Sequence, residues 1–361
     1  MVRPPGVSPA RIFMSESPTI ASPLSERLAR SPLAGSLVAD AVSMPVHWYY
    51  DREALRRDYG TINGYAAPKS PHPDSILWRS HYEAANPSGD ILREQAQFWG
   101  QRGVHYHQNL AAGDSTLNAR LAVSLAALIL EERGYNADRW LERYIHFMLE
   151  PGRNADTYVE EYHRIFFTNY AQSVKPRKCG GRDIHIGGLT PVPAIVEAMG
   201  LLGASLVEIR TVVQEHVSLT HRDDGVLRAA DALTRMLVRM AAGEELRAVM
   251  LDEAADWISR AKTADWDRYP DDVVVGRVLS PACYIPDAFP AALFLAWRHA
   301  ADFRAGVCSN AQVGGDNCHR GAVVGSLLAP AAGIPEDLLT GLAVAPRLAE
   351  LHANAPAVGT R

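Results

Sequence analysis

Apolar residues recur at helical spacing through most of this chain, and this periodicity limits the fold more than any other feature of the sequence. After Ser31, apolar side chains repeat every three or four positions, which places them on one face of a helix. In the most regular stretch, Asp114 or Ser115 can cap the helix and Gly134 can end it. The apolar face of this helix consists of Leu117, Leu121, Leu125, Leu128 and Ile129.

Similar patterns predict helices along the rest of the chain. Strand signals are scarce, because β-branched residues concentrate only over 272–278. We therefore expect an all-α fold, built as one compact orthogonal multi-helix domain over residues 31–345. A flexible leader rich in Pro and Ser is expected over 1–30, and a C-terminal tail over 346–361. The other predicted helices cover 139–149, 156–170, 193–202, 206–217, 225–242, 245–261, 287–301 and 320–328.

Charge and cysteine content exclude several classes of function. The formal net charge of −5 offers no basic surface for a nucleic-acid backbone, so we expect no nucleic-acid partner. The 4 cysteines are scattered without a CxxC pair, which argues against a disulfide framework and favours reduced thiols in a cytoplasmic protein. The longest apolar run, 121–130, is shorter than the roughly 20 residues that cross a bilayer, so no membrane contact is expected.

Two irregular segments interrupt the helical pattern. Residues 48–108 are rich in Pro, Gly, His and aromatic residues, and residues 172–193 contain two glycine pairs. Long irregular segments in a compact domain commonly line or cover a site. We expect these two segments to form the walls of a substrate site.

Four short stretches combine small residues, a carboxylate and an abrupt helix start. They lie at 35–48, 112–118, 220–223 and 314–321, with carboxylates that include Asp40, Asp114, Asp223 and Asp316. A carboxylate at a helix N-terminus has a fixed direction, and two such groups brought together make a hard oxygen site for Mg²⁺ or Mn²⁺. Taken one at a time, each Asp can equally be an ordinary N-cap and each Gly an ordinary turn residue.

In this order, the four stretches resemble the ADP-ribosylglycohydrolase family over roughly residues 31–333. That family has an early Gly-Asp-Ala-Leu-Gly-x-Pro-x-Glu segment, then Ser/Thr-Asp-Asp-Thr, a mid-chain Thr-His and a late Gly-Gly-Asp-Thr-Asp-Thr. Asp40, Pro45, the Gly-Gly-Asp of 314–316 and the small-residue helix of 322–328 match this order. The resemblance implies an all-α fold around two divalent metal ions that orient ribose hydroxyls and a water, and it implies hydrolysis of the C1″ bond of an ADP-ribosyl group.

Several of the family's metal ligands are replaced in this chain. The second motif reads Gly-Asp-Ser-Thr at 113–116, the last reads Gly-Gly-Asp-Asn-Cys-His at 314–319, and His47 stands at the early Glu position. Only Asp114, Thr116 and Asp316 remain as matching ligands. Because two dications need several carboxylates to balance their charge, two Mg²⁺ ions look poorly supported.

Three interpretations of the reaction centre remain. Asp114 and Asp316 hold one Mg²⁺ or Mn²⁺; or a Zn²⁺ is bound by Asp316, Cys318, His319 and His47; or no metal binds and His47 or His319 acts as acid or base. The catalytic candidates are therefore Asp114, Asp316, His47 and His319, and the metal-ligand candidates are Asp114, Thr116, Asp316, Cys318 and His319.

Substrate contacts are expected mainly from glycine-rich turns. Backbone N–H groups of such turns, together with Arg182, can bind a diphosphate. His105 and His107 form a His-x-His pair that can ligate a metal, although loop histidines of this kind are mostly hydrogen-bonded. The expected substrate-binding residues are Asn118, Gly180, Gly181, Arg182, Gly187, Gly188, Gly314 and Gly315.

Two functions follow from these observations. The first is a hydrolase that cleaves a ribosyl or related glycosidic bond with a modified metal centre, acting on a small molecule or an ADP-ribosyl substrate. The second is a catalytically inactive protein of the same fold that binds ADP-ribose or a nucleotide, or has a structural role. A monomer or a small homo-oligomer is expected in either case.

Overall fold

The computed structural model describes residues 23–354, and this part of the chain is built almost entirely of helices. Pairing of extended backbone is limited there to isolated bridges such as Gly181 with His221, so the predicted all-α fold is confirmed. The α-helices are α1 (Pro23–Ala29), α2 (Pro32–Ser43), α3 (Arg52–Tyr59), α4 (Leu117–Glu131), α5 (Ala137–Leu149), α6 (Glu161–Ala171), α7 (Val192–Leu201), α8 (Leu206–Ser218), α9 (Asp224–Ala241), α10 (Leu246–Glu253), α11 (Arg260–Trp266), α12 (Asp271–Val273), α13 (Ile285–Arg298), α14 (Phe303–Gln312), α15 (Asn317–Ala332), α16 (Glu336–Thr340) and α17 (Ala345–Ala353). Short 3₁₀ helices are η1 (Met44–Val46), η2 (Leu77–Arg79), η3 (Pro87–Gly89), η4 (Arg93–Phe98), η5 (Pro176–Lys178) and η6 (Ile186–Leu189), and a π-type turn, η7, spans Val274–Val278.

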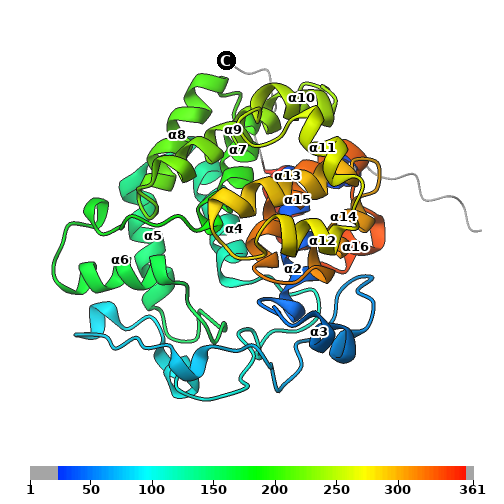
Figure 1. The fold of residues 1–361 in the computed structure, drawn as a ribbon. Helices are drawn as coiled ribbons and strands as arrows, with labels where there is room; N and C mark the ends of the chain where they lie inside the picture. The colour runs from blue at the N-terminus through cyan, green and yellow to red at the C-terminus, as the bar shows by residue number, and fades with distance from the viewer. Residues whose placement is uncertain (1–22, 355–361) are drawn as a thin grey trace, which may run out of the picture.

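Helices α2 and α15 form the centre of the molecule (Figure 1). They are antiparallel and touch through their backbones, because Gly35 faces Gly325 without side chains between them. A Cβ on Gly35 would lie 2.3 Å from the Gly325 carbonyl oxygen, and a Cβ on Gly325 would lie 2.1 Å from the Gly35 oxygen. Both helices are buried on nearly every side, so they carry apolar and small residues all round. The C-terminal end of α2 therefore lies beside the N-terminal end of α15.

Four parts of the chain differ from the periodicity that we read in the sequence. Residues 156–160 are extended and α6 begins only at Glu161, because the backbone there bonds to another loop: the Thr157 N–H donates to the Tyr106 carbonyl (3.0 Å). The stretch 245–261 is divided between α10 and the start of α11. Residues 303–312, for which we expected no helix, form α14. The β-branched run 272–278 forms no strand: it begins in α12 and continues as a turn whose backbone is non-helical at Val275 and Gly276, and the Arg52 guanidinium donates to the carbonyls of Asp272 and Val275.

The irregular segment between α3 and α4 runs along one end of the molecule (Figure 1). Tertiary hydrogen bonds stabilise this segment, instead of the regular backbone bonds of a helix or sheet. The Tyr106 hydroxyl accepts from the Ile76 N–H (2.8 Å), and the Trp99 indole donates to the Thr157 carbonyl (2.9 Å). The aromatic rings of Trp48, Tyr106 and Tyr158 pack edge to face beneath this segment.

Both expected terminal segments contain helix where the structure describes them. Helix α1 lies within 1–30, whose first 22 residues are outside the described part of the chain, and α17 lies within 346–361, described as far as residue 354. Leu348 of α17 is fully buried and His352 pairs with Glu197 of α7 (2.7 Å). All 4 cysteines are free, and no helix between residues 23 and 354 is long and apolar enough to cross a membrane.

Candidate active site

The turn before α15 brings two distant segments of the chain together. Gly314 and Gly315 have φ angles of +71° and +70°, a region that favours glycine. A Cβ on Gly314 would lie 2.2 Å from the Tyr49 carbonyl oxygen, and the Gly315 N–H donates to that same oxygen (2.8 Å). These two glycines, for which we expected substrate contact, hold the loop after α2 against the start of α15. As a result His47 lies beside Asp316.

Asp316 is fully buried, and imidazoles from three segments of the chain contact its carboxylate. Its Oδ1 is 3.2 Å from Nε2 of His47 and 2.7 Å from Nδ1 of His319, while its Oδ2 is 3.1 Å from Nε2 of His185. The same carboxylate caps α15 by accepting from the His319 N–H (3.4 Å). Burial opposes ionisation of Asp316, but the charge of His319 holds the pKa of this carboxyl well below its usual range.

A second buried carboxylate reaches Asp316 through two stacked imidazoles. Asp156 Oδ1 lies 2.9 Å from Nδ1 of His107, and Nε2 of His107 lies 2.7 Å from Nδ1 of His47. The rings of His47 and His107 are parallel within 6° and 5.0 Å apart. Asp156 also accepts from the Leu117 N–H at the start of α4. Asp156, His107, His47 and Asp316 thus form one continuous chain of contacts.

The number of protons in this chain decides its charge. Each of its contacts, from Asp156 to His107, from His107 to His47 and from His47 to Asp316, needs one proton. Two neutral imidazoles carry only two protons between them. Either the pair holds an extra proton, or the Nε2 of His47 presents a bare lone pair toward Asp316. Burial lowers the pKa of His47 to about 4, although Asp316 opposes this shift. The lowered pKa favours a neutral His47.

On its far side, His319 contacts a carboxylate and an amide. Its Nε2 is 3.5 Å from Oε1 of Glu160 and 2.8 Å from Nδ2 of Asn118. Asn118 Oδ1 accepts from the Tyr162 hydroxyl (2.7 Å) and lies 2.9 Å from Nε2 of His163. Burial alone would lower the pKa of His319, but Asp316 and Glu160 raise it to about 10. A proton on Nε2 requires the Asn118 amide to turn its oxygen toward this ring, so the amide and the imidazole are coupled.

His185 is fixed in a single neutral tautomer. Its Nδ1 accepts a hydrogen bond from the Gly187 N–H (2.8 Å), which requires an unprotonated nitrogen there. The proton of the neutral ring is therefore on Nε2, the atom that lies 3.1 Å from Asp316 Oδ2. His72 and His105 are fixed in the same way, because each accepts a backbone N–H at Nδ1 and donates from Nε2 to a backbone carbonyl.

Other residues that the sequence singled out lie apart from the Asp316 carboxylate. Asp114 is partly exposed, and its Oδ2 accepts from the Ala111 N–H (2.8 Å). Thr116 donates its hydroxyl and its N–H to Asp40 (2.7 and 2.9 Å). The buried Cys318 thiol contacts the Asp40 carbonyl (3.7 Å), and burial raises the pKa of this thiol. Of the catalytic and metal-ligand candidates, the structure brings together Asp316, His319 and His47, and the Cys318 sulfur lies within 4.8 Å of ring nitrogens of His47 and His107.

The glycine pairs have different surroundings. A Cβ on Gly180 would lie 2.0 Å from the Leu219 carbonyl oxygen, so this glycine permits a close backbone approach. Gly181 accepts from the Arg222 N–H (2.9 Å), and the exposed Arg182 pairs with Asp223 (3.3 Å).

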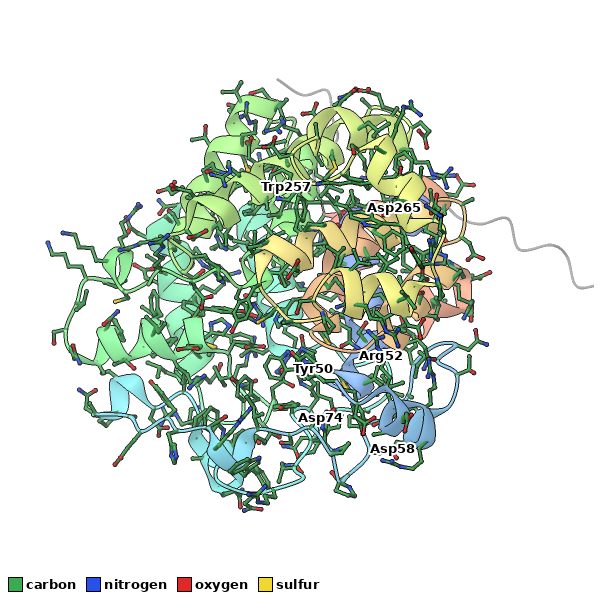
Figure 2. All side chains as sticks on the ribbon, viewed as in Figure 1. Tyr50, Arg52, Asp58, Asp74, Trp257 and Asp265 are labelled. Carbon is green, nitrogen blue, oxygen red and sulfur yellow. The ribbon has the colours of Figure 1, made fainter. Side chains whose placement is uncertain are left out.

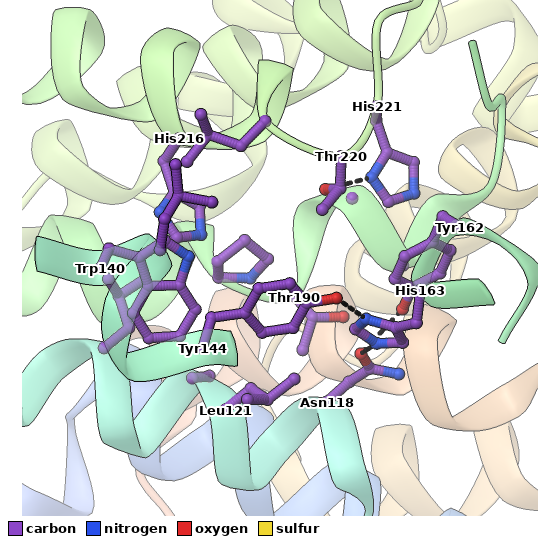
Figure 3. A pocket seen from close by; sticks show the side chains of 17 residues that line it. Asn118, Leu121, Trp140, Tyr144, Tyr162, His163, Thr190, His216, Thr220 and His221 are labelled. Atoms are coloured by element: carbon purple, nitrogen blue, oxygen red, sulfur yellow. Dashed lines mark hydrogen bonds between the residues drawn. The ribbon is translucent and has the colours of Figure 1, made fainter. Parts of the chain in front are cut away.

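A small cavity of about 50 Å³ lies on the other side of Asn118 (Figure 3). Its polar end includes His221 and Thr190, whose Nε2 and Oγ1 atoms have no protein hydrogen-bond partner. Its apolar end is formed by Leu121, Leu125 and Trp140. The space is large enough for ordered water or a small polar group next to the histidine cluster. Of the glycines that we predicted to contact substrate, Gly187 and Gly188 line this cavity.

Sequence reasoning missed several members of the cluster. His107 had a visible signal, the His-x-His pair, but its partner Asp156 lay in a segment that we expected to be helical. Glu160, His163 and His185 gave no signal, because their partners are more than 40 residues away in the sequence.

Comparison with known proteins identifies the family. The sequence profile of ADP-ribosylglycohydrolase matches residues 22–359. This chain belongs to the ADP-ribosylglycohydrolase family. Crystallin J1A of Tripedalia cystophora is 23% identical over 322 residues, which cover 83% of this chain and 86% of that protein. A solved structure described as an ADP-ribosylglycohydrolase-related protein complex has the same fold, with a TM-score of 0.58 at 20% identity, covering 91% of this chain and 98% of that one.

The donor atoms at Asp316 do not suit the pair of Mg²⁺ ions that the family implies. Magnesium prefers carboxylate, carbonyl and water oxygens in octahedral geometry. Here a single carboxylate meets imidazole nitrogens, Asp114 is bonded to its own turn, and Asp40 is occupied by Thr116. Two dications next to one carboxylate would lack the negative charge that holds them together.

Proposed function

We propose that this member of the ADP-ribosylglycohydrolase family hydrolyses a glycosidic bond of a ribosyl or ADP-ribosyl compound at Asp316. The observation that carries the proposal is the contact of one buried carboxylate with the imidazoles of His47, His319 and His185. Burying charged groups costs free energy, and clusters with perturbed pKa values occur preferentially at functional sites.

The arrangement suits hydrolysis through a transition state with positive charge on the sugar. As the bond from C1″ to the leaving group breaks, charge develops on the ribose ring, and the Asp316 carboxylate stabilises it. A water molecule forms the new bond to C1″ and gives its proton to an imidazole of the cluster. An imidazolium on the other side of the carboxylate protonates the leaving group, so the products are the free ribosyl hydroxyl and the protonated acceptor.

Exposed aromatic rings near Asp316 offer a place for the substrate to enter. Tyr50 is 48% exposed and Tyr284 is 54% exposed (Tyr50 is labelled in Figure 2). Tyr50 directly follows Tyr49, whose carbonyl oxygen accepts from the N–H of Gly315, the residue before Asp316 (2.8 Å). Cys283, next to Tyr284, is close to Asp316 and His185. A base or a sugar can stack between these rings on its way to the carboxylate.

A second candidate is a binding or structural role without turnover. It is favoured by the relative named crystallin J1A and by the deep burial of the cluster, whose His47, Asp316 and His319 are each at most 2% exposed. In this case the histidines would only balance the charge of Asp316.

Release of ADP-ribose separates the two candidates. The full chain is incubated with peptides that carry ADP-ribose on arginine or on serine, and free ADP-ribose is measured by chromatography. We expect turnover that falls by at least about 100-fold in Asp316→Asn, whose amide can still cap α15. The matched control is Asp265→Asn, an exposed aspartate in α11 that is paired only with Arg268. Absence of turnover on every substrate, or equal turnover in Asp316→Asn, would favour the binding or structural role.

A further inference from the structure

We infer that the cluster binds one divalent ion of the Zn²⁺ class through His47 Nε2, His319 Nδ1 and Asp316 Oδ1, in place of the two Mg²⁺ ions typical of the family. The three donor atoms lie within 4.8 Å of one another, all of them buried. Two ligands on one Zn²⁺, with bonds of about 2.0–2.1 Å and tetrahedral angles, lie roughly 3.3 Å apart. His47 Nε2 and Asp316 Oδ1 are already 3.2 Å apart, whereas His319 Nδ1 is 2.7 Å from Asp316 Oδ1 and has to move outward by roughly 0.6 Å to admit the ion.

The contacts of His47 direct a lone pair toward the ion. A histidine that binds a metal through Nε2 must keep its proton on Nδ1 and donate it to a partner. Here that partner is Nε2 of His107 at 2.7 Å, and His107 in turn donates from Nδ1 to Asp156 at 2.9 Å. With both imidazoles neutral, the proton count leaves Nε2 of His47 bare. A metal ion supplies the positive charge that the gap between His47 and Asp316 otherwise lacks.

His319 has an equivalent partner on its remote nitrogen. Binding through Nδ1 requires a proton on Nε2, and the acceptors near Nε2 are the Glu160 carboxylate at 3.5 Å and the Asn118 amide at 2.8 Å, once the amide turns its oxygen toward the ring. Both histidines are thus backed by a carboxylate, directly for His319 and through His107 for His47. This carboxylate–histidine–metal order recurs at protein zinc sites.

Asp316 completes the set and is itself held in place. His185 cannot bind the ion through Nε2, because its Nδ1 accepts the Gly187 N–H and the proton must stay on Nε2. His185 Nε2 lies 3.1 Å from Asp316 Oδ2, so His185 is next to the carboxylate oxygen that the ion does not use. The Cys318 thiol contacts the Asp40 carbonyl and stays outside the set.

The ligand chemistry selects the ion. Two imidazoles and one carboxylate suit Zn²⁺ or Co²⁺, whereas Mg²⁺ requires oxygen ligands. Three protein ligands leave a fourth position for water, which is the pattern of catalytic rather than structural zinc sites. Only this last role rests on the proposed function, because binding of the ion can be measured without turnover.

The test is a titration of the chelator-treated full chain with Zn²⁺, Co²⁺ and Mg²⁺, followed by calorimetry and elemental analysis. We expect one Zn²⁺ per chain and no binding of Mg²⁺ at the same concentration. His47→Gln and His319→Gln are expected to weaken Zn²⁺ binding by more than about 100-fold, and Asp156→Asn by roughly 10- to 100-fold through loss of the outer partner. The matched control is His352→Gln, a buried histidine paired with Glu197 far from the cluster, which should bind Zn²⁺ as the natural chain does.

The Co²⁺ spectrum of the unmodified chain keeps the test decisive if a variant fails to fold. Visible absorption typical of tetrahedral Co²⁺ supports the site, and the spectrum of the aqueous ion overturns it. Stoichiometric Zn²⁺ binding that is equal in His47→Gln and His319→Gln also overturns it. Zn²⁺ binding without release of ADP-ribose would leave the metal site standing and remove the proposed function, whereas turnover by a chain that binds no Zn²⁺ would do the reverse.

Discussion

The molecule contains two networks of charged side chains that differ in their contact with water. One is the cluster around Asp316 at the centre. The other is a ladder across α8, α9 and α10, in which Arg210 pairs with Asp231 (2.6 Å), Arg235 pairs with Asp231 and with Glu253 (2.6 Å), and Arg239 pairs with Glu253 (2.8 Å). The side chains of the ladder are 18–43% exposed, whereas those of His47, Asp316 and His319 are 0–2% exposed.

The two networks differ in how much stability is lost when one partner is removed. In the ladder, arginine and carboxylate remain hydrated, so each pair contributes little and its loss leaves no buried charge. In the cluster, each polar group has lost its hydration and is stabilised by a buried partner. Removal of one partner therefore leaves a buried charge or polar atom without compensation, which destabilises the fold. An apolar core of the same shape would be at least as stable. The cluster is therefore better explained by chemistry than by stability.

The largest expected effect is the loss of the central carboxylate. Asp316→Leu keeps the branched shape of the side chain but leaves the buried imidazoles without an acceptor, and it should lower the free energy of unfolding by about 3–5 kcal/mol. Urea denaturation in the presence of a chelator measures this change. A loss below 1 kcal/mol would mean that water enters the cluster freely and that the contrast with the ladder fails.

A buried histidine without a carboxylate partner tests the effect of burial alone. His216 of α8 contacts the Tyr135 hydroxyl (3.2 Å), and burial lowers its pKa from 6.5 to about 3. The folded chain thus binds fewer protons at this site than the unfolded chain, so its stabilisation is complete above pH 6.5 and is lost as the pH falls toward 3. When the pH falls from 7 to 4, the His216→Gln variant should lose roughly 3 kcal/mol less stability than the natural chain. Denaturation curves of both proteins at the two pH values measure it, and parallel losses would contradict the shift.

The smallest effect is expected in the ladder. Asp231→Asn removes the carboxylate shared by Arg210 and Arg235, but both guanidinium groups can return to water. We expect a loss of at most about 1 kcal/mol, which shrinks further in 1 M salt because the ions screen exposed charges. Thermal unfolding at low and high salt measures this. A larger loss of stability that does not change with salt would mean that the ladder is desolvated like the cluster.

Helical periodicity was sufficient to predict the fold class, because most helices bury one regular apolar face. It failed where tertiary hydrogen bonds compete with local preference. Residues 156–160 have helical spacing, yet the Asp156 carboxylate bonds to the start of α4 and to His107, which keeps this segment extended. The β-branched residues of 272–278 are typical of a strand, but this segment forms a tight turn in which the Arg52 guanidinium donates to the carbonyls of Asp272 and Val275.

Only the part of the candidate site that lies at the end of α2 and the start of α15 could be predicted from the sequence. The motif order pointed to His47, Asp316 and His319, which the structure brings together. It pointed equally to Asp114, which the structure places in a turn of its own. Motifs locate residues near a helix start, but they carry no information about which remote side chain completes a hydrogen bond. The partners of His107, and the presence of Glu160 and His185 in the cluster, therefore became visible only once the chain was folded.

The backbone contact between α2 and α15 sets the distance between these two helices at the centre of the molecule. His47 and Asp316 are 269 residues apart in the sequence, yet 3.2 Å apart in space, and each lies at or just beyond the end of one of these two helices. The separation of the helices is set where Gly35 meets Gly325, by the absence of two side chains. Because this spacing does not depend on what stands at positions 47, 316 and 319, side chains there can be exchanged without moving the frame. The same scaffold can thus carry a different set of donor atoms, while the distance between the ends of the two helices stays constant.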